Sequence, residues 1–479
     1  MMKPVDMGGL ATAYDAASAG TSILQNWRVD RGGTNIPRDA FVAYTLTGIN
    51  ADTTIIGCVE YAGDLIVVGS DRWIYRVPYT SPNIAVPLSV SGDATTTLGG
   101  TARPVFARDP SDLFIAGGGR ISRVTSGAPV ASRFTTGPEN ATHIAGLGQR
   151  LVSNDATNAT TRQQFFWSDL GDGNDSTWSA LSFATAEARP DEVVGIFENT
   201  QELFIFGEST IQVYSVGVDP LNPWDTVNTI NVGLGAAYSV FRYDNTFAFI
   251  DENSRIVSTD GHASSVKDMS RDIITTLRGF DVTDAIGWRE RDGRYDLYCW
   301  IFPTGGICLE YNPETKTWAE RAYYDSVTLL QGPPPLSCHE YWSELGIHVY
   351  GRTDTNGLAT LSDTAGLDFG DTRLCRRVTG YSDYGTNAAK RSRRIRAVAR
   401  RGTSGPSGTP DAIEVRVQDD GRPWTSWKPI SVGNDGDDHQ TVDLHFGGVF
   451  NRRRVEIRYS GSDATSLVSL SDDVEALRD

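Results

Sequence analysis

Ile55-Ile56-Gly57-Cys58, Asp64-Leu65-Ile66-Val67-Val68-Gly69 and Trp73-Ile74-Tyr75 make up the stretch that decides the fold. It returns without a gap 138 residues later as Val193-Val194-Gly195-Ile196, Glu202-Leu203-Phe204-Ile205-Phe206-Gly207 and Ile211-Gln212-Val213. A third copy, Ala285-Ile286-Gly287-Trp288 with Tyr295-Asp296-Leu297-Tyr298, lies a further 92 residues along. Because 138 and 92 are three and two times 46, the chain repeats a unit of about 46 residues.

Each copy of the unit has the same plan. A short strand ends near a glycine, a polar turn follows, and a continuous apolar run then predicts a strand buried on both faces. Such a unit cannot cover its own faces, whereas units stacked around an axis cover one another. We therefore predict an all-β chain in which residues 46–370 form a β-propeller of about seven blades, with six possible. A β-sandwich with coincidental spacing is the alternative fold.

The two ends of the chain differ from the repeats. Residues 371–479 hold alternating strand-like segments separated by Gly/Asp/Ser-rich turns, which predicts a C-terminal β-sandwich or jelly-roll-like domain. Residues 1–45 lack periodicity and are expected to form an extended N-terminal arm that packs on its own propeller or on a neighbour. Within the repeats, residues 305–318 resemble a kelch-type hairpin, with Asn312-Pro313 opening the turn and Trp318 packing between blades.

Composition limits the function classes. The 479 residues carry a formal net charge of −17, which argues against a general nucleic-acid coat. No apolar run approaches the roughly 18 residues of a membrane span, so membrane insertion is not expected. Five dispersed cysteines without a C-x-x-C pair are typical of buried free thiols rather than of a disulfide framework or a zinc site.

One segment opposes the overall charge. Residues 373–402 hold ten Lys/Arg against one acid, Asp383. Within this segment the strand-like run 389–396 presents Lys390, Arg391, Arg393 and Arg394 as candidate contacts. An acidic protein partner, DNA, and a solvated edge strand kept monomeric by like charge are the three interpretations.

Catalytic motifs are lacking. The six histidines show no metal-ligand spacing, and the sequence contains neither a nucleophile elbow nor a phosphate-binding loop. The acidic run Asp169–Asp175 offers oxygen ligands for calcium, but it lacks the closing glutamate of an EF-hand, which favours a solvated loop. We predict no catalytic residues, cofactor or metal. The competing function is a glycan-binding or glycan-cleaving propeller, either a receptor-binding tail protein or a sialidase-like enzyme, because 60 acidic residues leave room for a pair of carboxylates.

The chain resembles the packaged-DNA stabilisation proteins of short-tailed bacteriophages, also called tail nozzle or tail accessory proteins. The resemblance rests on the propeller repeats, the C-terminal β-domain, and three short phrases: Asn26-Trp27-Arg28-Val29-Asp30-Arg31-Gly32-Gly33, Pro37-Arg38-Asp39-Ala40-Phe41, and Phe166-Trp167-Ser168-Asp169 with Trp178. A bacterial propeller scaffold unrelated to phages is a third possibility.

The resemblance implies a structural protein of the virion tail, assembled in the host cytoplasm. It implies a homohexameric ring that extends the portal channel, closes the tail and helps to retain packaged DNA. The expected partners are further copies of the chain, a head-to-tail adaptor protein, and tail needle, plug or fibre proteins. DNA would pass through the lumen without sequence-specific binding. In such a ring, Trp27, Arg28, Arg31 and Arg38 are hypothesised to anchor the arm on a neighbouring subunit.

Overall fold

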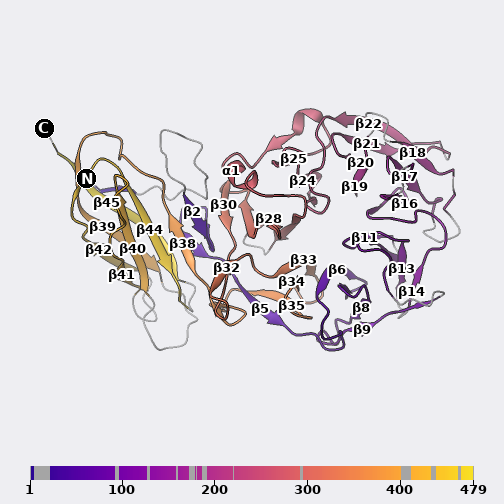
Figure 1. Cartoon of the computed structure of the whole chain (residues 1–479), viewed down its shortest axis with the longest axis horizontal. Coiled ribbons are helices and arrows are strands. Elements are labelled where there is room, and N and C mark those ends of the chain that lie inside the picture. The colour runs from indigo at the N-terminus through magenta and orange to yellow at the C-terminus, as the bar shows by residue number, and fades with distance from the viewer. Residues whose placement is uncertain are drawn as a thin grey trace.

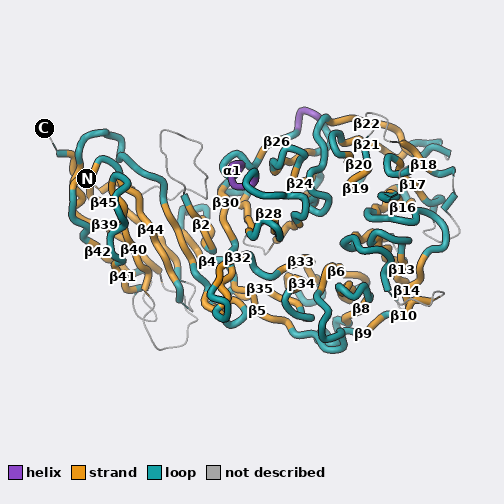
Figure 2. Tube along the Cα trace, viewed as in Figure 1, coloured by secondary structure: helices purple, strands orange, loops and turns teal. Residues whose placement is uncertain are grey.

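The computed structural model describes residues 2–4, 22–91, 97–109, 111–126, 130–157, 160–171, 178–179, 181–185, 191–219, 221–291, 295–400, 412–432, 439–461 and 465–477. Strands dominate these residues (Figure 2), and the helical elements among them are α1 (Ile274–Leu277) and a 3-10 turn (Ala263–Ser265). No helix in the described ranges is long and apolar enough to span a membrane. The all-β prediction is confirmed.

Seven antiparallel sets of four strands, called meanders 1 to 7 here, make up the larger part of the fold. Meander 1 contains β6 (Ile55–Tyr61), β7 (Asp64–Gly69), β8 (Ile74–Val77) and β9 (Val86–Pro87). Meander 2 contains β11 (Val105–Arg108), β12 (Asp112–Ala116), β13 (Ser122–Thr125) and β14 (Val130–Arg133), and β10 (Ser89–Ser91) pairs with β14 in parallel. Meander 3 contains β15 (Ile144–Leu147), β16 (Arg150–Asn154), β17 (Gln164–Trp167) and β18 (Phe183–Thr185).

The remaining meanders continue along the chain. Meander 4 contains β19 (Val193–Glu198), β20 (Glu202–Gly207), β21 (Ile211–Val216) and β22 (Trp224–Ile230). Meander 5 contains β23 (Phe241–Tyr243), β24 (Thr246–Ile250), β25 (Ile256–Thr259) and β26 (Lys267–Asp268). Meander 6 contains β27 (Ile286–Arg291), β28 (Asp296–Phe302), β29 (Ile307–Asn312) and β30 (Thr317–Glu320). Meander 7 contains β33 (Leu336–Trp342), β34 (Ile347–Arg352), β35 (Leu358–Ser362) and, from far upstream, β5 (Ala40–Tyr44).

The meanders follow one another in a ring (Figure 1). Their apolar second strands are buried over almost their full length, as in β7 and β12. Seven hydrophobic clusters join consecutive meanders, and one of them joins meander 7 back to meander 1. This packing is the pattern expected of propeller blades, in which each sheet covers the faces of its neighbours.

The contact between meanders 7 and 1 also includes hydrogen bonds. Ser337 Oγ donates to the carbonyl oxygen of Ile55, and Trp342 Nε1 donates to that of Gly63 at 2.8 Å. Ser343 Oγ lies 2.6 Å from the Glu60 carboxylate. Because β5 comes from the N-terminal side and its three partner strands from residues 336–362, the last meander combines distant parts of the chain.

The kelch-type hairpin forms as predicted. Asn312 Oδ1 accepts hydrogen bonds from the backbone N–H groups of Glu314 and Thr315 at 3.0 and 3.4 Å. Trp318 Nε1 donates to the carbonyl oxygen of Met269 at 2.9 Å. Met269 directly follows β26 of meander 5, so Trp318 of meander 6 does pack between two meanders.

Two further sheets follow at the C-terminal side. One continues meander 6 into a nine-stranded sheet through β2 (Ile23–Gln25), β38 (Cys375–Val378), β44 (Arg453–Tyr459), β40 (Ala412–Asp419) and β41 (Lys428–Ser431). The other contains β3 (Trp27–Val29), β4 (Asn35–Pro37), β45 (Ser466–Ala476), β39 (Lys390–Arg400) and β42 (Gln440–Leu444), with β1 (Met2–Pro4) and β43 (Val449–Phe450) at its edges. Alternate residues of both sheets, among them Ile395, Val415 and Ile457, share one core.

Two short hairpins complete the described strands: β31 (Tyr323–Asp325) with β32 (Leu330–Gly332), and β36 (Leu367–Asp368) with β37 (Asp371–Thr372). Residues 23–44, where the extended arm was expected, contribute β2 to β5 to three sheets of their own chain. The rest of that segment, residue 1 and residues 5–21, lies outside the described residues.

The closing strand β5 provides the first prediction. Phe41 is fully buried, and its ring contacts Tyr350 edge-on at 5.4 Å and stacks on Phe369 at 6.0 Å. Phe41→Ala should lower the free energy of unfolding by about 3–5 kcal/mol because it leaves a cavity where β5 meets meander 7. Urea denaturation measures the loss. The matched control is Val42→Ala, whose side chain on the same strand is 37% exposed; its effect should stay within about 0.5 kcal/mol. Equal losses in the two variants would contradict this role of β5.

Candidate functional site

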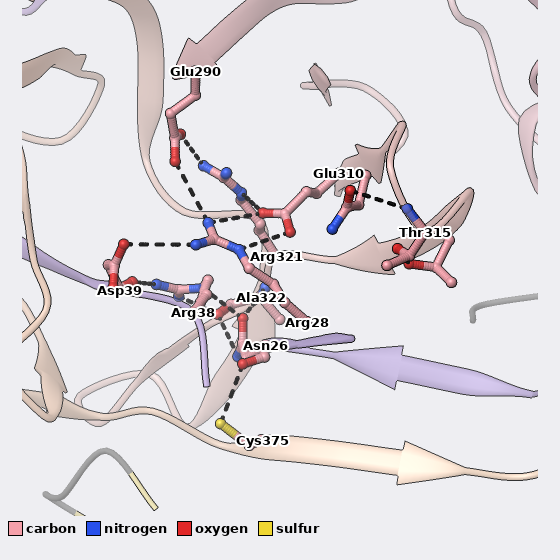
Figure 3. A network of polar contacts seen from close by, with 12 residues as sticks. Asn26, Arg28, Arg38, Asp39, Glu290, Glu310, Thr315, Arg321, Ala322 and Cys375 are labelled. Carbon is pink, nitrogen blue, oxygen red and sulfur yellow. Dashed lines mark hydrogen bonds and ion pairs between the residues drawn. The ribbon is translucent and has the colours of Figure 1, made fainter. Parts of the chain in front are cut away.

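A buried ionic network lies where meander 6 meets the N-terminal strands (Figure 3). Arg321 donates to Glu290 at 2.8 Å and to Glu310 at 2.7 Å. Arg28, on β3, donates to Glu310 at 2.8 and 3.1 Å and to Glu290 at 3.5 Å. Tyr350, on β34 of meander 7, donates its hydroxyl to Glu290 at 2.6 Å. The network therefore joins two meanders to an N-terminal strand.

The two glutamates are ionised although they are buried. Burial alone would raise the pKa of Glu290, but Arg321 and Arg28 outweigh it and hold this pKa well below its ordinary value. For Glu310, too, burial works against ionisation, and Arg28 and Arg321 lower the pKa. The two buried arginines face two buried glutamates, and the partly exposed Asp39 lies 3.6 Å from Arg28 as a third carboxylate. Opposite charges therefore compensate the arginines, which is the condition for holding charge inside a protein.

Glu290 and Glu310 are a pair of carboxylates in a propeller, so they are the natural place to test for glycosidase chemistry. A glycosidase needs one carboxylic acid that keeps its proton and one free carboxylate, both in contact with substrate. Here both carboxylates are almost inaccessible to solvent, and each binds arginine. The arrangement suits a structural connection and lacks the asymmetry of an acid–base pair.

A second group of buried polar side chains fixes the two ends of the β3–β4 pair, Asn26 before β3 and Arg38 after β4. Arg38 forms a two-pronged contact with Asp368, at 2.5 and 3.0 Å, and donates to Asn26 Oδ1 at 2.8 Å. Asn26 Nδ2 donates to the carbonyl oxygens of Ala322 and Leu374, each at 2.9 Å. Asn26 has a positive φ of 55°, which asparagine tolerates better than most residues. This one side chain therefore links meander 6 to the start of the C-terminal sheets.

The residues proposed from sequence as arm contacts have different surroundings. Trp27, Arg28 and Arg38 are buried in their own chain, at 0, 3 and 2% exposure. Arg31 is exposed and pairs with Glu314 of the kelch-type turn. Of the four, Arg31 alone presents its side chain on the surface described, and partner contact remains a prediction for it.

The basic strand β39 is largely matched by its own neighbours. Lys390 is buried and donates to the carbonyl oxygens of Ala388 and Asn451 at 2.7 and 2.6 Å. Arg393 pairs with Glu475 at 2.8 Å. Arg394 pairs with Asp443 at 2.8 Å, and Arg391 is exposed. Glu475 and Asp443 therefore neutralise part of the positive charge of β39. Contact with a partner remains a prediction for Arg391, Arg393 and Arg394.

Sequence reasoning missed Glu290, Glu310 and Arg321. A signal was present: Glu310 interrupts the apolar run Ile307-Cys308-Leu309 on a strand predicted to be buried. A charge in such a position requires a buried partner. The partner, however, comes partly from Arg28, which is 282 residues away in sequence.

No cluster of three or more His, Cys, Asp or Glu side chains suited to a metal ion occurs in the described part of the chain. The acidic run Asp169–Asp175 lies partly outside it, because residues 172–177 are not described. Among the described residues, all five cysteines are free thiols, four of them buried and Cys338 half-buried.

Comparison with known proteins gives one family. Residues 74–260 match the model of the phage stabilisation family, described as bacteriophage P22 Gp10, beta-propeller. The matched region, less than half of the chain, extends from meander 1 into meander 5. The match supports a phage stabilisation protein with a virion-associated, structural and non-enzymatic role. No curated protein sequence matches the chain.

Solved structures show weaker similarities. A computationally designed protein, Ika8, has 9% identity and a TM-score of 0.42, covering 74% of this chain and all of its own. The extracellular domain of a putative hybrid two component system from B. thetaiotaomicron has 10% identity and a TM-score of 0.45, covering 74% of this chain and 43% of that one. A chain of the Mitotic Checkpoint Complex has 14% identity and a TM-score of 0.42, covering 67% of this chain and 93% of that one. These scores lie below 0.5, so no argument is built on them.

Removing one carboxylate tests the ionic network. Glu310→Gln leaves the two buried arginines with one buried carboxylate, that of Glu290, and the partly exposed Asp39, so the free energy of unfolding should fall by about 3–5 kcal/mol. Glu314→Gln is the matched control, since it makes the same change in the exposed pair with Arg31 and should cost less than about 1 kcal/mol. Chemical denaturation at neutral pH measures both. A loss below about 1 kcal/mol for Glu310→Gln would show that the network does not hold the fold.

The difference in unfolding free energy between the wild type and Glu310→Gln should depend on pH. Because the pKa of Glu310 is lowered on folding, its ionisation stabilises the native state above the ordinary glutamate pKa, and this stability is lost as the pH falls. The gap in unfolding free energy between wild type and Glu310→Gln should therefore narrow as the pH is lowered below about 4.5. Denaturation curves between neutral and acidic pH test this, and a gap that stays constant would contradict the linkage.

Proposed function

We propose that the chain is a structural protein of a short-tailed phage virion, which forms a tail nozzle or hub ring. In this proposal it extends the portal channel, closes the tail and helps to retain packaged DNA until genome ejection. Six copies would form the ring, bound to a head-to-tail adaptor on one side and to needle, plug or fibre proteins on the other. The family match over residues 74–260 is the observation that carries the proposal.

We further propose that the seven meanders are the blades of one closed seven-bladed propeller. Support comes from the apolar cluster between meanders 7 and 1 and from the strand β5, which completes the last meander. In this arrangement the packed sheets would make the body rigid. Rigidity is what a protein under pressure from packaged DNA requires.

The charge of the chain suits a conduit. With a net charge of −17, a ring of these subunits would repel phosphate groups overall, so DNA could pass without binding to a fixed sequence. The buried network supports the same interpretation, because its two carboxylates serve the fold and leave no acid–base pair at that place.

Deletion of the gene from its phage tests the proposed function. Heads should still fill with DNA, but a large fraction should lose it, because the tail channel is left unsealed. The measurement is nuclease-protected genome per particle, with the protein supplied from a plasmid as the control. Particles that retain their DNA without the protein would overturn the proposal. If they retained it but no longer attached to host glycans, a receptor-binding role would replace it.

A further inference from the structure

An alternating stack of arginine and aromatic side chains, called the ladder face here, lies on one side of the nine-stranded sheet, at β40 and β44. In spatial order its members are Arg452, Tyr381, Arg454, Trp424, Arg416, Trp427 and Arg458. Each guanidinium group lies over the next ring, with six successive distances to ring centroids of 4.8, 4.9, 4.9, 4.9, 4.3 and 4.1 Å. The stack is held by β44, β40 and the connections beside them, whose alternate residues face the core.

The ladder face carries more positive than negative charge. Arg416 shares the Glu456 carboxylate with Arg376, at 2.5 and 2.6 Å. Arg458 pairs with Glu414 at 2.5 Å, and Arg454 bonds the uncharged Gln418 at 2.6 Å. The four arginines of the ladder face, together with Arg376, thus meet the carboxylates of Glu456 and Glu414. A third carboxylate, that of Asp420, accepts the backbone N–H of Arg452 at 2.9 Å.

Arginine and tryptophan are the side chains most enriched at the energetic centres of protein interfaces. Stacking also restricts the guanidinium groups before any partner arrives, so less entropy is lost on binding. These properties favour a protein partner with acidic and apolar groups.

The opposite end of the molecule has that character. Figure 1 shows β40, β41 and β44 at one end of the long axis and β21 and β22 of meander 4 towards the other. At the tip of the β21–β22 hairpin, Val218 and Leu221 are 101 and 86% exposed, and Asp219 and Asp225 are exposed beside them. We call this tip the acidic hairpin.

Meander 3 extends the same surface. A Cβ built on Gly148 would lie 2.7 Å from Val216, so the turn after β15 packs against the base of the hairpin. The backbone N–H of Gly171 bonds the carbonyl oxygen of Gln149 in that turn at 2.9 Å. This bond brings Asp169 and Leu170, both exposed, to the same region.

The sequence divides its charge in the same way. Residues 163–241, which include β17 and β18 of meander 3 and all of meander 4, hold eleven acids and a single cation, Arg189. Arg162 and Arg242, just outside this range, pair with Glu192 and Glu198. Residues 373–479 hold eighteen Lys/Arg and fifteen Asp/Glu, a net charge of +3 in a chain whose total is −17. The molecule is therefore electrostatically polar from end to end.

We infer that the ladder face of one copy binds the acidic hairpin of a second copy. The aspartates would meet the arginines, and Val218 and Leu221 would pack on the tryptophan rings. Because the two surfaces differ and lie on one molecule, the contact is head-to-tail, the kind that forms rings when its rotation closes. The inference rests on the proposed function for its biological setting and names the surfaces through which copies join.

Two variants separate the halves of the contact. Arg452→Glu/Arg454→Glu reverses the ladder face without touching the arginines paired with Glu456 or Glu414. Asp219→Lys/Leu221→Lys reverses the hairpin tip. Matched controls are Arg271→Glu, which is exposed on the turn before α1, and Val327→Lys, which is 89% exposed on the β31–β32 hairpin. Unchanged circular dichroism and melting temperature confirm that every variant is folded.

Sedimentation and mass photometry of the full chain at low salt provide the readout. The wild type and both controls should self-associate, and each test variant alone should weaken association by about 100-fold or more, because like charges then face each other. An equimolar mixture of the two test variants should associate again, since each retains one intact half of the contact and the two reversed halves are opposite in charge.

Several results would overturn the inference: a wild type that stays monomeric up to submillimolar concentration, test variants that assemble like the wild type, or a mixture that remains monomeric. Fluorescence anisotropy with single-stranded and duplex DNA provides a further arm. Binding that Arg452→Glu/Arg454→Glu abolishes would assign the ladder face to nucleic acid instead. If the proposed self-association fails these tests, the DNA-retention experiment still tests the proposed function separately, because it measures protected genome and not self-association.

Discussion

A four-stranded meander with an apolar second strand has two apolar faces, and both must be buried against other parts of the protein. The rest of this structure follows from that requirement. Consecutive meanders cover one another, but a row of them would still end in two bare faces. Here the cluster around Leu65, Val67 and Val349 covers both ends at once by joining meander 7 to meander 1. The strand β5 then places the two sides of the chain in one sheet. Separating these meanders would expose apolar surface on each, so the ring is held by the same hydrophobic effect that forms its sheets.

The N-terminal strands are fixed by a different force. Arg28 and Arg38 carry full charges into the interior, where each would be costly without a partner. Glu310 and Glu290 compensate the first and Asp368 the second. Buried ion pairs add little net stability compared with apolar contacts, but they tolerate few alternative arrangements. The network therefore determines where residues 26–38 lie more than it determines how stable the protein is.

Particular residues show what the sequence could and could not predict. The repeat at 55–75 and the turn at Asn312 rely on contacts between near neighbours, so spacing and turn chemistry were enough. The pairing of Phe41 with Leu361 spans more than three hundred residues, and five residues such as Ala40–Tyr44 carry no mark of their partner. The sequence shows the positive charge of β39 directly. It does not show that Asp443 and Glu475, which lie on other strands, neutralise part of that charge. Arg28 looked like a surface anchor because its partners lie so far along the chain.

The nine-stranded sheet gives these local arrangements a mechanical consequence. It runs without a break from β27 of the ring, through the parallel pairing of β2 with β30, to β41 at the far edge of the C-terminal sheets. Asn26 reinforces the junction by bonding both Ala322 and Leu374. A hinge at this place would have to break sheet hydrogen bonds and expose buried charge together, so the ring and the C-terminal sheets should move as one body. The ladder face and the acidic hairpin are then held at a fixed separation and angle. In a head-to-tail contact that angle alone decides whether copies close into a ring or extend into a filament, so the rigidity of this junction is what would make the number of subunits definite.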